Sequence, residues 1–110
     1  INVLTMHHID RCGMRDIMQK AVELAGNGTR GVHLSFDMDV IDPMVAPGVG
    51  TPVRGGITYR EAALAVEMLA EAQIIRTLEF VEVNPTLDSA NETSHVAVGL
   101  IAAALGEKIL

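Results

Sequence analysis

The sequence predicts an α/β fold of three layers, with a parallel sheet between two layers of helices. Stretches of strand length alternate along the chain with amphipathic stretches of helix length, and this order favours right-handed crossovers between parallel strands. The 110 residues amount to one domain or less, and 49% of them are hydrophobic, which is enough for a core. Because only 3% are aromatic, we expect a core of aliphatic residues, methionine and alanine.

The first part of the chain is predicted to form a strand, a helix and a second strand. Residues 2–6 are predicted to be a short strand. Apolar residues then recur every three or four positions from Met14 to Ala25, which predicts a helix that ends at the glycines that follow. Residues 32–36 are apolar and β-branched, so they predict a buried strand, in which His33 is expected to be buried and hydrogen-bonded.

The second part is predicted to begin with a long loop, residues 38–57, which holds three of the four prolines. Ordered loops of this length tend to be functional. A helix is expected up to residue 72, because Thr58 and Glu61 have the spacing of a capping box at its start. A third strand, residues 74–83, and a final helix with caps at residues 89–91 complete the predicted order.

Charge and cysteine content limit the classes of function. The formal net charge of −6 argues against a nucleic-acid partner, because neutralising phosphates requires clustered lysines and arginines. A single cysteine, Cys12, excludes an internal disulfide and suits a reducing compartment. No apolar run reaches transmembrane length, so we expect no membrane partner and a soluble, cytoplasmic protein. The start at Ile1, inside a strand-like run, indicates a piece of a longer polypeptide.

The strongest functional signal is the pair Asp37 and Asp39 at the end of the second predicted strand. In an extended chain these two side chains point to the same side, about 7 Å apart. Two carboxylates at that distance repel by roughly 2–3 kcal/mol at an effective dielectric constant of about 20, so a compensating cation is expected. All-oxygen ligands favour a hard ion such as Mg²⁺ or Mn²⁺. The alternative is a solvated loop pair, with Asp42 as a turn former.

The same two aspartates also fit a magnesium-dependent phosphatase of the haloacid dehalogenase type, with Asp37 as the nucleophile. That interpretation requires a catalytic lysine downstream of the motif. Lys20 precedes the motif and Lys108 falls in the final predicted helix, so neither lysine is well placed.

Further polar residues are expected at the same sheet edge, because ligands of such sheets bind outside the carboxyl ends of the strands. His7 and His8 follow the first predicted strand, and Glu82 and Asn84 end the third. Glu82 is either an exposed or salt-bridged strand end, or a carboxylate that receives a cationic group of a substrate. For the two histidines, exposed or hydrogen-bonded roles are favoured over metal binding.

Three segments together resemble the arginases, a branch of the ureohydrolases, which also include agmatinase. They are SFDMDVIDP at residues 35–43, GTPVRGGITYRE at residues 50–61 and EVNP at residues 82–85. The first is typical of the whole family, and the other two favour a bacterial, Bacillus-type arginase over agmatinase. The resemblance covers essentially the whole chain. It implies that residues 1–110 are the C-terminal part of a single catalytic domain with an arginase/deacetylase-like fold.

The resemblance implies a site with two Mn²⁺ ions that hydrolyses L-arginine to L-ornithine and urea. Asp37 would bridge both ions and Asp39 would bind one of them. A hydroxide made available by metal coordination would attack the guanidinium carbon. Glu82 would hold the guanidinium group by a charge-assisted pair, and Thr51 would line the substrate site. Asp37, Asp39 and Glu82 are therefore the expected catalytic residues.

The resemblance also implies a homo-oligomer, a trimer or a hexamer, in which Arg60 and Glu61 lie between subunits. The family's remaining metal ligands, two histidines and two aspartates, are absent from this chain, as are the residues that hold the α-amino and carboxylate groups of the substrate. We therefore expect the isolated segment to be inactive. Agmatinase or another ureohydrolase, and a fragment without catalytic function, remain the alternatives.

Overall fold

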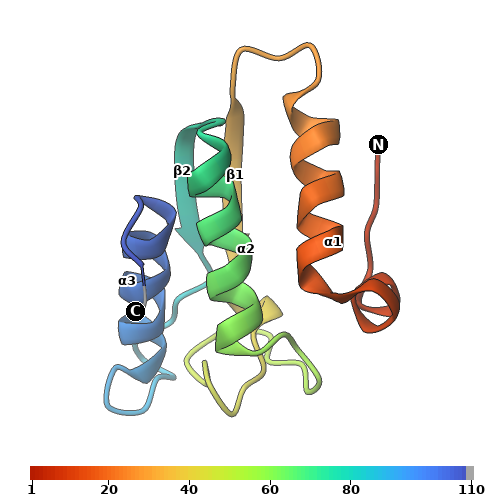
Figure 1. The fold of residues 1–110 in the computed structure, drawn as a ribbon. Helices are drawn as coiled ribbons and strands as arrows, with labels where there is room; N and C mark the ends of the chain where they lie inside the picture. Colours follow the sequence, from red (N-terminus) through yellow and green to blue (C-terminus); the bar gives the residue numbers. More distant parts are fainter. Residues whose placement is uncertain (109–110) are drawn as a thin grey trace.

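The computed structural model describes residues 1–108, which form three α-helices, two strands and one short 3₁₀ helix (Figure 1). The connection between the two strands runs through a helix, so the α/β class predicted from the sequence is confirmed. In chain order the elements are α1 (Met6–Gly26), β1 (Val32–Asp37), η1 (Met38–Val40), α2 (Tyr59–Ala72), β2 (Ile75–Val81) and α3 (Glu92–Ala104).

The strands β1 and β2 form a two-stranded parallel sheet. The register pairs Leu34 with Leu78 and Phe36 with Phe80, and the two phenylalanine rings stack with their centroids 5.1 Å apart. This apolar face packs against the hydrophobic core, to which the helices contribute. The opposite face is exposed, so within residues 1–108 the second layer of helices that we expected is not formed.

His33 lies on the exposed face of the sheet, and the prediction that it is a core residue is wrong. Its side chain is 53% exposed, and its Nδ1 lies 2.7 Å from the hydroxyl of Thr77 on the neighbouring strand. Glu79 shares this face, where it accepts a hydrogen bond from Ser35. The strand forms as predicted and His33 is hydrogen-bonded, but no described element covers the face that carries it.

The predicted first strand, residues 2–6, is wrong. Residues 1–5 have no regular secondary structure, and α1 begins at Met6. A local cap supports this start, because the Thr5 N–H donates to Nδ1 of His8 over 3.0 Å. The helix bends at Gly13, whose φ of 79° is in the left-handed region that favours glycine. The predicted helix from Met14 is the part of α1 after this bend.

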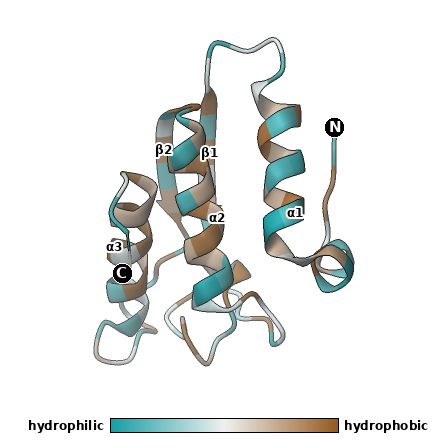
Figure 2. Cartoon of the chain, viewed as in Figure 1, coloured by the Kyte–Doolittle hydropathy of each residue, from teal (hydrophilic) through white to brown (hydrophobic). Residues whose placement is uncertain are grey.

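The helix α2 lies between α1 and α3 and packs against both of them (Figure 1). Its predicted capping box is confirmed: the Glu61 N–H donates to the Thr58 hydroxyl over 3.2 Å, and the Thr58 N–H donates to the Glu61 carboxylate over 2.8 Å. The alanines at 62, 63 and 65 are buried, and such small side chains allow neighbouring elements to approach closely. The helices differ in hydropathy, since α3 is mostly hydrophobic while the visible face of α1 is mostly hydrophilic (Figure 2).

The long loop between η1 and α2 is part of the core. Its buried side chains are those of Ile41, Ala46, Val49 and Ile57. It is also tied to itself, because Ile41 and Ile57 form a parallel bridge across the loop. This anchoring explains how a loop of such length can hold functional groups in fixed places.

The last strand and the last helix both differ from their predicted bounds. β2 ends at Val81 and not at residue 83, because Glu82 has a left-handed φ of 66° that interrupts the extended chain. α3 begins at Glu92, as the caps near residues 89–91 predicted. The side chain of Asn91 does not cap this helix, and the Asp88 carboxylate accepts the N–H groups of Thr93 and Ser94 instead.

An apolar groove of about 360 Å³ lies between α1, β1 and α2 and is lined by Met14, Ile17, Phe36, Val66 and Leu69, among others. Among residues 1–108, no helix combines the length and the apolar character needed to cross a bilayer.

Candidate functional site

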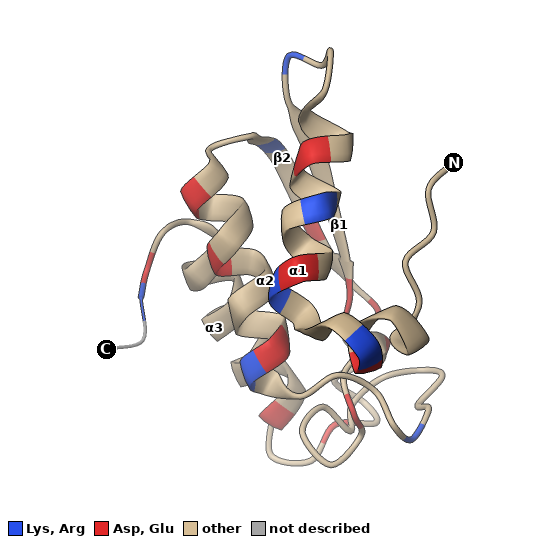
Figure 3. Cartoon of the chain, turned by 45° about the vertical axis from the view of Figure 1, so that its right-hand side comes forward, with Lys and Arg blue, Asp and Glu red and all other residues tan. Residues whose placement is uncertain are grey.

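The candidate site lies at the carboxyl end of the parallel sheet. Asp37 ends β1 and is paired with Val81 of β2, so Glu82 follows directly at the same edge. Because neighbouring strands lie about 4.8 Å apart, the register brings two carboxylate residues from distant parts of the chain to one edge. Acidic residues are also found in the loops beyond this end of β1 (Figure 3).

Asp37 and Asp39 are related by a turn and not by an extended strand. Asp39 lies in η1, and its N–H donates to Oδ1 of Asp37 over 3.1 Å. The expected extended geometry of the pair is therefore wrong, because the strand stops at Asp37. Asp37 is exposed and Asp39 is half-buried. Both side chains nevertheless stay at the end of β1, with carboxylate oxygens available to an incoming group.

Thr51 comes to this pair from the long loop. Its hydroxyl donates a hydrogen bond to Oδ2 of Asp39, while Oδ1 of Asp37 accepts the N–H of Asp39. The hydroxyl thereby fixes one oxygen of the Asp39 carboxylate and keeps Thr51 beside it. The predicted metal ligand Asp39 and the predicted substrate residue Thr51 are thus in direct contact.

Glu82 lies next to Gly50, the residue that precedes Thr51. A Cβ atom placed on Gly50 would lie 3.6 Å from Oε2 of Glu82, so the glutamate carboxylate lies over this glycine. Glu82 is exposed, and its φ of 66° is uncommon for a residue other than glycine, asparagine or aspartate. Such strained residues cluster at functional sites.

The loop that carries Thr51 is fastened to the chain that follows Glu82. Val49 forms an antiparallel bridge with Val83, and the Asn84 N–H donates to the Gly48 carbonyl over 2.8 Å. These contacts hold the two sides of the site at a fixed spacing. The sequence did not point to Val49 or Gly48, because this pairing joins the predicted loop of residues 38–57 to the end of the predicted third strand, and no local pattern indicates it.

Asp42 closes the other part of the loop. Its carboxylate accepts the N–H groups of Met44 over 2.9 Å and of Gly55 over 2.8 Å. The hydrogen bond from Met44, and after it the one from Gly55, lower the pKa of the Asp42 carboxyl below its ordinary value. The nearby Arg54 guanidinium lowers this pKa further, whereas partial desolvation opposes the shift. The turn role considered for Asp42 is confirmed, and its hydrogen bonds also reach across the loop to Gly55.

The two aspartates carry the donor atoms that a hard divalent cation prefers. Carboxylate oxygens are the donors that such ions prefer, and no lysine or arginine in the described part of the chain pairs with Asp37 or Asp39. Among residues 1–108, no group of three or more His, Cys, Asp or Glu side chains is arranged to hold a metal ion. The donor type of Asp37 and Asp39 therefore fits a hard cation, but two carboxylates alone do not form a complete metal site.

The expected convergence of His7 and His8 on the sheet edge is wrong, because the strand that would place them there does not form. Both residues are exposed in the first turn of α1. His8 is engaged with Thr5, whose hydroxyl lies 2.9 Å from its Nδ1. The hydrogen-bonded role favoured from the sequence is confirmed for His8.

The remaining predicted residues lie on α2 and at the end of the chain. Arg60 is exposed, and the Glu61 carboxylate is occupied by the N–H and hydroxyl of Thr58, each 2.8 Å away. A place for Arg60 and Glu61 between subunits stays a prediction. Lys108 follows α3 and pairs with Glu71 at 2.8 Å. It is therefore not the catalytic lysine that a phosphatase would require.

Comparison with known proteins identifies the family. A sequence model of the Arginase family matches residues 1–106. The arginase of Bacillus caldovelox is 56% identical over 110 residues, and that of Brevibacillus brevis is 53% identical; each match covers all of this chain and 37% of the relative. The solved B. caldovelox arginase superimposes with a TM-score of 0.96, again over 100% and 37% of the two chains. The formimidoylglutamase of Bacillus subtilis superimposes with a TM-score of 0.90 at 32% identity, over 96% of this chain and 33% of that one.

The chain thus spans little more than a third of the relatives that it matches. The α/β fold expected from the resemblance is confirmed by the structural matches. The expected position of the segment, in the C-terminal part of such an enzyme, is not confirmed.

Proposed function

The chain belongs to the arginase family, and from this we propose that it carries part of the active site of a manganese-dependent enzyme that hydrolyses L-arginine to L-ornithine and urea. The observation that supports this proposal most directly is the meeting of Asp39, Thr51 and Glu82 at one edge of the sheet. In the proposal the complete protein acts in the cytoplasm as a homo-oligomer, with Arg60 and Glu61 between subunits.

In this proposal Asp37 and Asp39 hold the manganese ions, with further ligands from the rest of the protein. Manganese ions held there would supply the positive charge that makes water available as a nucleophile near neutral pH. Thr51 donates to Asp39 and so fixes which oxygen of that carboxylate is free for a ligand. The role of Asp37 is supported by its exposure at the end of β1.

Glu82 is proposed to receive the guanidinium group of the substrate. A guanidinium donates two parallel N–H groups, and a carboxylate accepts them in a charge-assisted, bidentate pair. Glu82 is suited to this because its carboxylate is exposed and lies over Gly50, where no side chain blocks the approach. The pair would orient the guanidinium carbon relative to Asp37 and Asp39.

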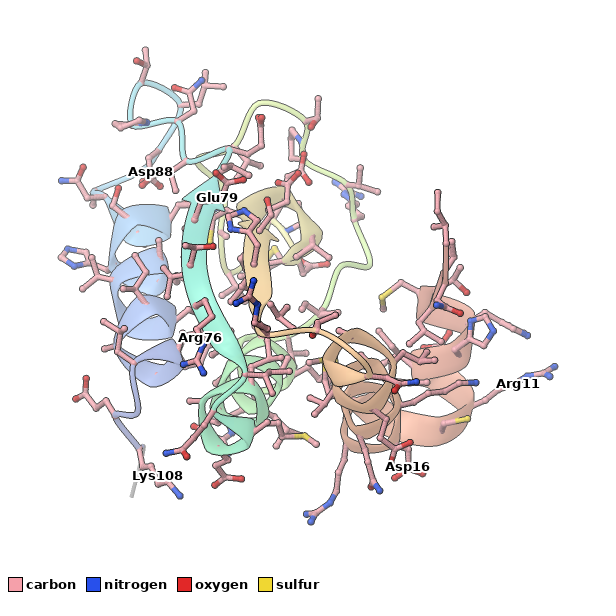
Figure 4. All side chains as sticks on the ribbon, turned by 90° about the horizontal axis from the view of Figure 1, so that it is seen from above. Arg11, Asp16, Arg76, Glu79, Asp88 and Lys108 are labelled. Carbon is pink, nitrogen blue, oxygen red and sulfur yellow. The ribbon has the colours of Figure 1, made fainter. Side chains whose placement is uncertain are left out.

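The proposal is tested on the complete protein, purified with Mn²⁺, by measuring urea release from L-arginine and bound manganese. Asp37→Asn is expected to abolish urea release and to reduce the metal content. Asp16→Asn is the matched control, because Asp16 is an exposed carboxylate on α1, well away from the sheet edge (Figure 4). Retained activity with full metal occupancy in Asp37→Asn would contradict the role given to Asp37.

Another substrate is the alternative to L-arginine, since the chain is also 32% identical to a formimidoylglutamase and to an agmatinase. The residues that would distinguish arginine from agmatine or from other substrates are not among the site residues described above. Comparing kcat/KM for L-arginine, agmatine and N-formimidoyl-L-glutamate decides among them. A highest value for agmatine or for the formimidoyl compound would replace the substrate proposed here and leave the metal ligands unchanged.

A fragment without catalytic function is the remaining alternative for the isolated 110-residue chain. The incomplete set of metal ligands favours it for the chain alone. Urea release by the complete protein but not by the isolated chain is the expected result. Release by the isolated chain at a comparable rate would show that the missing ligands are supplied within it.

A further inference from the structure

We propose that Thr93 is a positioning residue, whose buried hydroxyl holds residues 48–51 in the place that sets Thr51 and Glu82 for the substrate. Thr93 touches neither the proposed substrate nor the proposed metal ligands, and it acts through Gly48. The kinetic part of this inference rests on the proposed function. Its structural part does not.

Thr93 is fully buried, and it is the one buried polar residue among residues 1–108. Its hydroxyl accepts the Gly48 N–H over 2.7 Å, and its backbone N–H donates to the Asp88 carboxylate over 3.1 Å. Burying a hydroxyl is unfavourable unless it is hydrogen-bonded, and here its partner, the Gly48 N–H, lies inside the protein. Thr93 therefore links two segments that lie far apart in the sequence.

Asp88 fixes Thr93 from the other side. Oδ1 of Asp88 accepts the Thr93 N–H over 3.1 Å, and Oδ2 accepts the Ser94 N–H over 3.2 Å. Desolvation by itself would raise the pKa of the Asp88 carboxyl, but the hydrogen bonds from Thr93 and Ser94 outweigh it and the pKa is lowered. The carboxylate stays ionised and locks the first turn of α3, which Figure 4 shows beside Asp88.

Gly48 is held so closely that only glycine fits. A Cβ atom on Gly48 would lie 2.4 Å from Cβ of Asp88, which real side chains do not tolerate. The close approach of the two chains is what brings the Gly48 N–H within reach of the Thr93 hydroxyl. Without that hydroxyl, the N–H of this buried residue would lose the one partner described for it, which is unfavourable.

Gly48 and its neighbour Val49 contact the chain on both sides of the site, so the position of Gly48 affects both sides. Its carbonyl accepts the N–H of Asn84 over 2.8 Å, and its neighbour Val49 bridges to Val83, directly after Glu82. Two residues further on, Thr51 donates to Asp39. A shift of Gly48 would therefore change the spacing between Thr51 and Glu82, which are the residues proposed to receive the substrate.

The test uses the complete protein and compares Thr93→Val with Thr93→Ser. Valine has the shape of threonine but no hydroxyl, whereas serine keeps the hydroxyl and loses only a methyl group. Ser94→Ala is the control, because it removes a contact of 3.4 Å to the same Asp88 carboxylate and leaves the bond to Gly48 intact. For each variant we measure amide hydrogen exchange of residues 48–51, bound manganese, and KM and kcat for L-arginine.

Thr93→Val is expected to speed exchange of the Gly48 amide by about tenfold or more, since a buried hydrogen bond is lost. It is also expected to raise KM by about tenfold while kcat changes less than about threefold, because the spacing of substrate-binding groups changes and the metal ligands do not. Thr93→Ser and Ser94→Ala should keep exchange and KM within about twofold of the wild type. Bound manganese should be unchanged in all three.

Equal exchange and equal KM in Thr93→Val and the wild type would overturn the proposal, and so would equal losses in Thr93→Val and Thr93→Ser. If Thr93→Val does not fold, amide exchange in the wild type and in Thr93→Ser provides the test. A Gly48 amide that exchanges without protection in the wild type contradicts the inference. A Gly48 amide that is as protected as the amides in the core of α3, in both proteins, supports it. A wild-type protein that releases no urea would refute the proposed function, and the exchange result would still test the role of Thr93.

Discussion

Asp42 and Gly55 are joined across the long loop by a hydrogen bond of 2.8 Å, which the Gly55 N–H donates to Oδ2 of the Asp42 carboxylate. The other oxygen of Asp42 accepts the Met44 N–H. One carboxylate thus fastens both the start and the end of the loop that carries Thr51. The candidate site depends on this closure, because Thr51 lies between the two fastened points.

We predict that this closure makes stability depend on pH. The folded-state pKa of Asp42 is lowered by its two backbone hydrogen bonds, so its contribution is fully present above the unfolded-state value of about 3.9 and is lost as the pH falls through the folded-state pKa. Asp42→Asn in the complete protein should lower the urea midpoint at pH 6, and the difference from the wild type should shrink below about pH 4. Asp16→Asn, an exposed carboxylate on α1, should show no such difference. A constant difference at both pH values would contradict the assignment.

We predict that Gly56→Ala is strongly destabilising. A Cβ atom at this position would lie 2.5 Å from the Val40 carbonyl oxygen and 2.6 Å from the Asp42 nitrogen, and both are backbone atoms that cannot move aside cheaply. We expect a loss of about 1–3 kcal/mol in the free energy of unfolding. Gly26→Ala is the matched control, because its Cβ would meet only a side-chain methyl group at 3.9 Å. Equal unfolding midpoints of the two variants would show that the loop can shift to make room.

We predict that Thr58→Ala costs about 1 kcal/mol, because the N-cap hydroxyl that accepts the Glu61 N–H is removed. Thr86→Ala serves as the comparison, since Thr86 is exposed and only its backbone N–H is hydrogen-bonded in the described structure. Urea unfolding of both variants measures the difference. If Glu61 instead acts mainly between subunits, Thr58→Ala will change the oligomer distribution in analytical ultracentrifugation more than the unfolding midpoint.

We predict that the isolated chain binds Mn²⁺ with a Kd weaker than about 10 µM, which corresponds to a binding free energy less favourable than about −7 kcal/mol. The reason is that Asp37 and Asp39 lack further ligands among residues 1–108. Calorimetric titration of the wild-type chain and of Asp37→Asn tests this, with circular dichroism to show that both are folded. Tighter binding that Asp37→Asn abolishes would mean that the chain holds a complete set of ligands.

Much of the fold could be predicted because its signals are local. The capping box of Thr58 and Glu61, the apolar strand that ends at Asp37 and the end of α1 at Gly26 are each specified by a few neighbouring residues. The first strand was predicted wrongly because residues 2–6 have strand-like composition but no strand beside them in the described chain. A strand depends on its partner, and sequence composition does not reveal whether that partner is present.

The candidate site could be predicted only in part. Asp37, Asp39 and Glu82 were found because they follow apolar strands, and parallel strands bring such residues to one edge. The left-handed turn at Glu82 could not be found, because glutamate carries no local signal for it. Thr93 was also missed, since its hydroxyl acts on Gly48, 45 positions away, and only the folded chain brings the two together.

The backbone of Glu82 has a consequence for how this position can vary. Its left-handed conformation is easiest for glycine, asparagine and aspartate, so a library of variants selected for thermal stability alone should drift away from glutamate. A library selected for turnover should keep glutamate, if its carboxylate receives the substrate. Position 82 would then be under two opposed selection pressures. Comparing the residue enriched by each selection would separate the requirement of the backbone conformation from the requirement of the reaction.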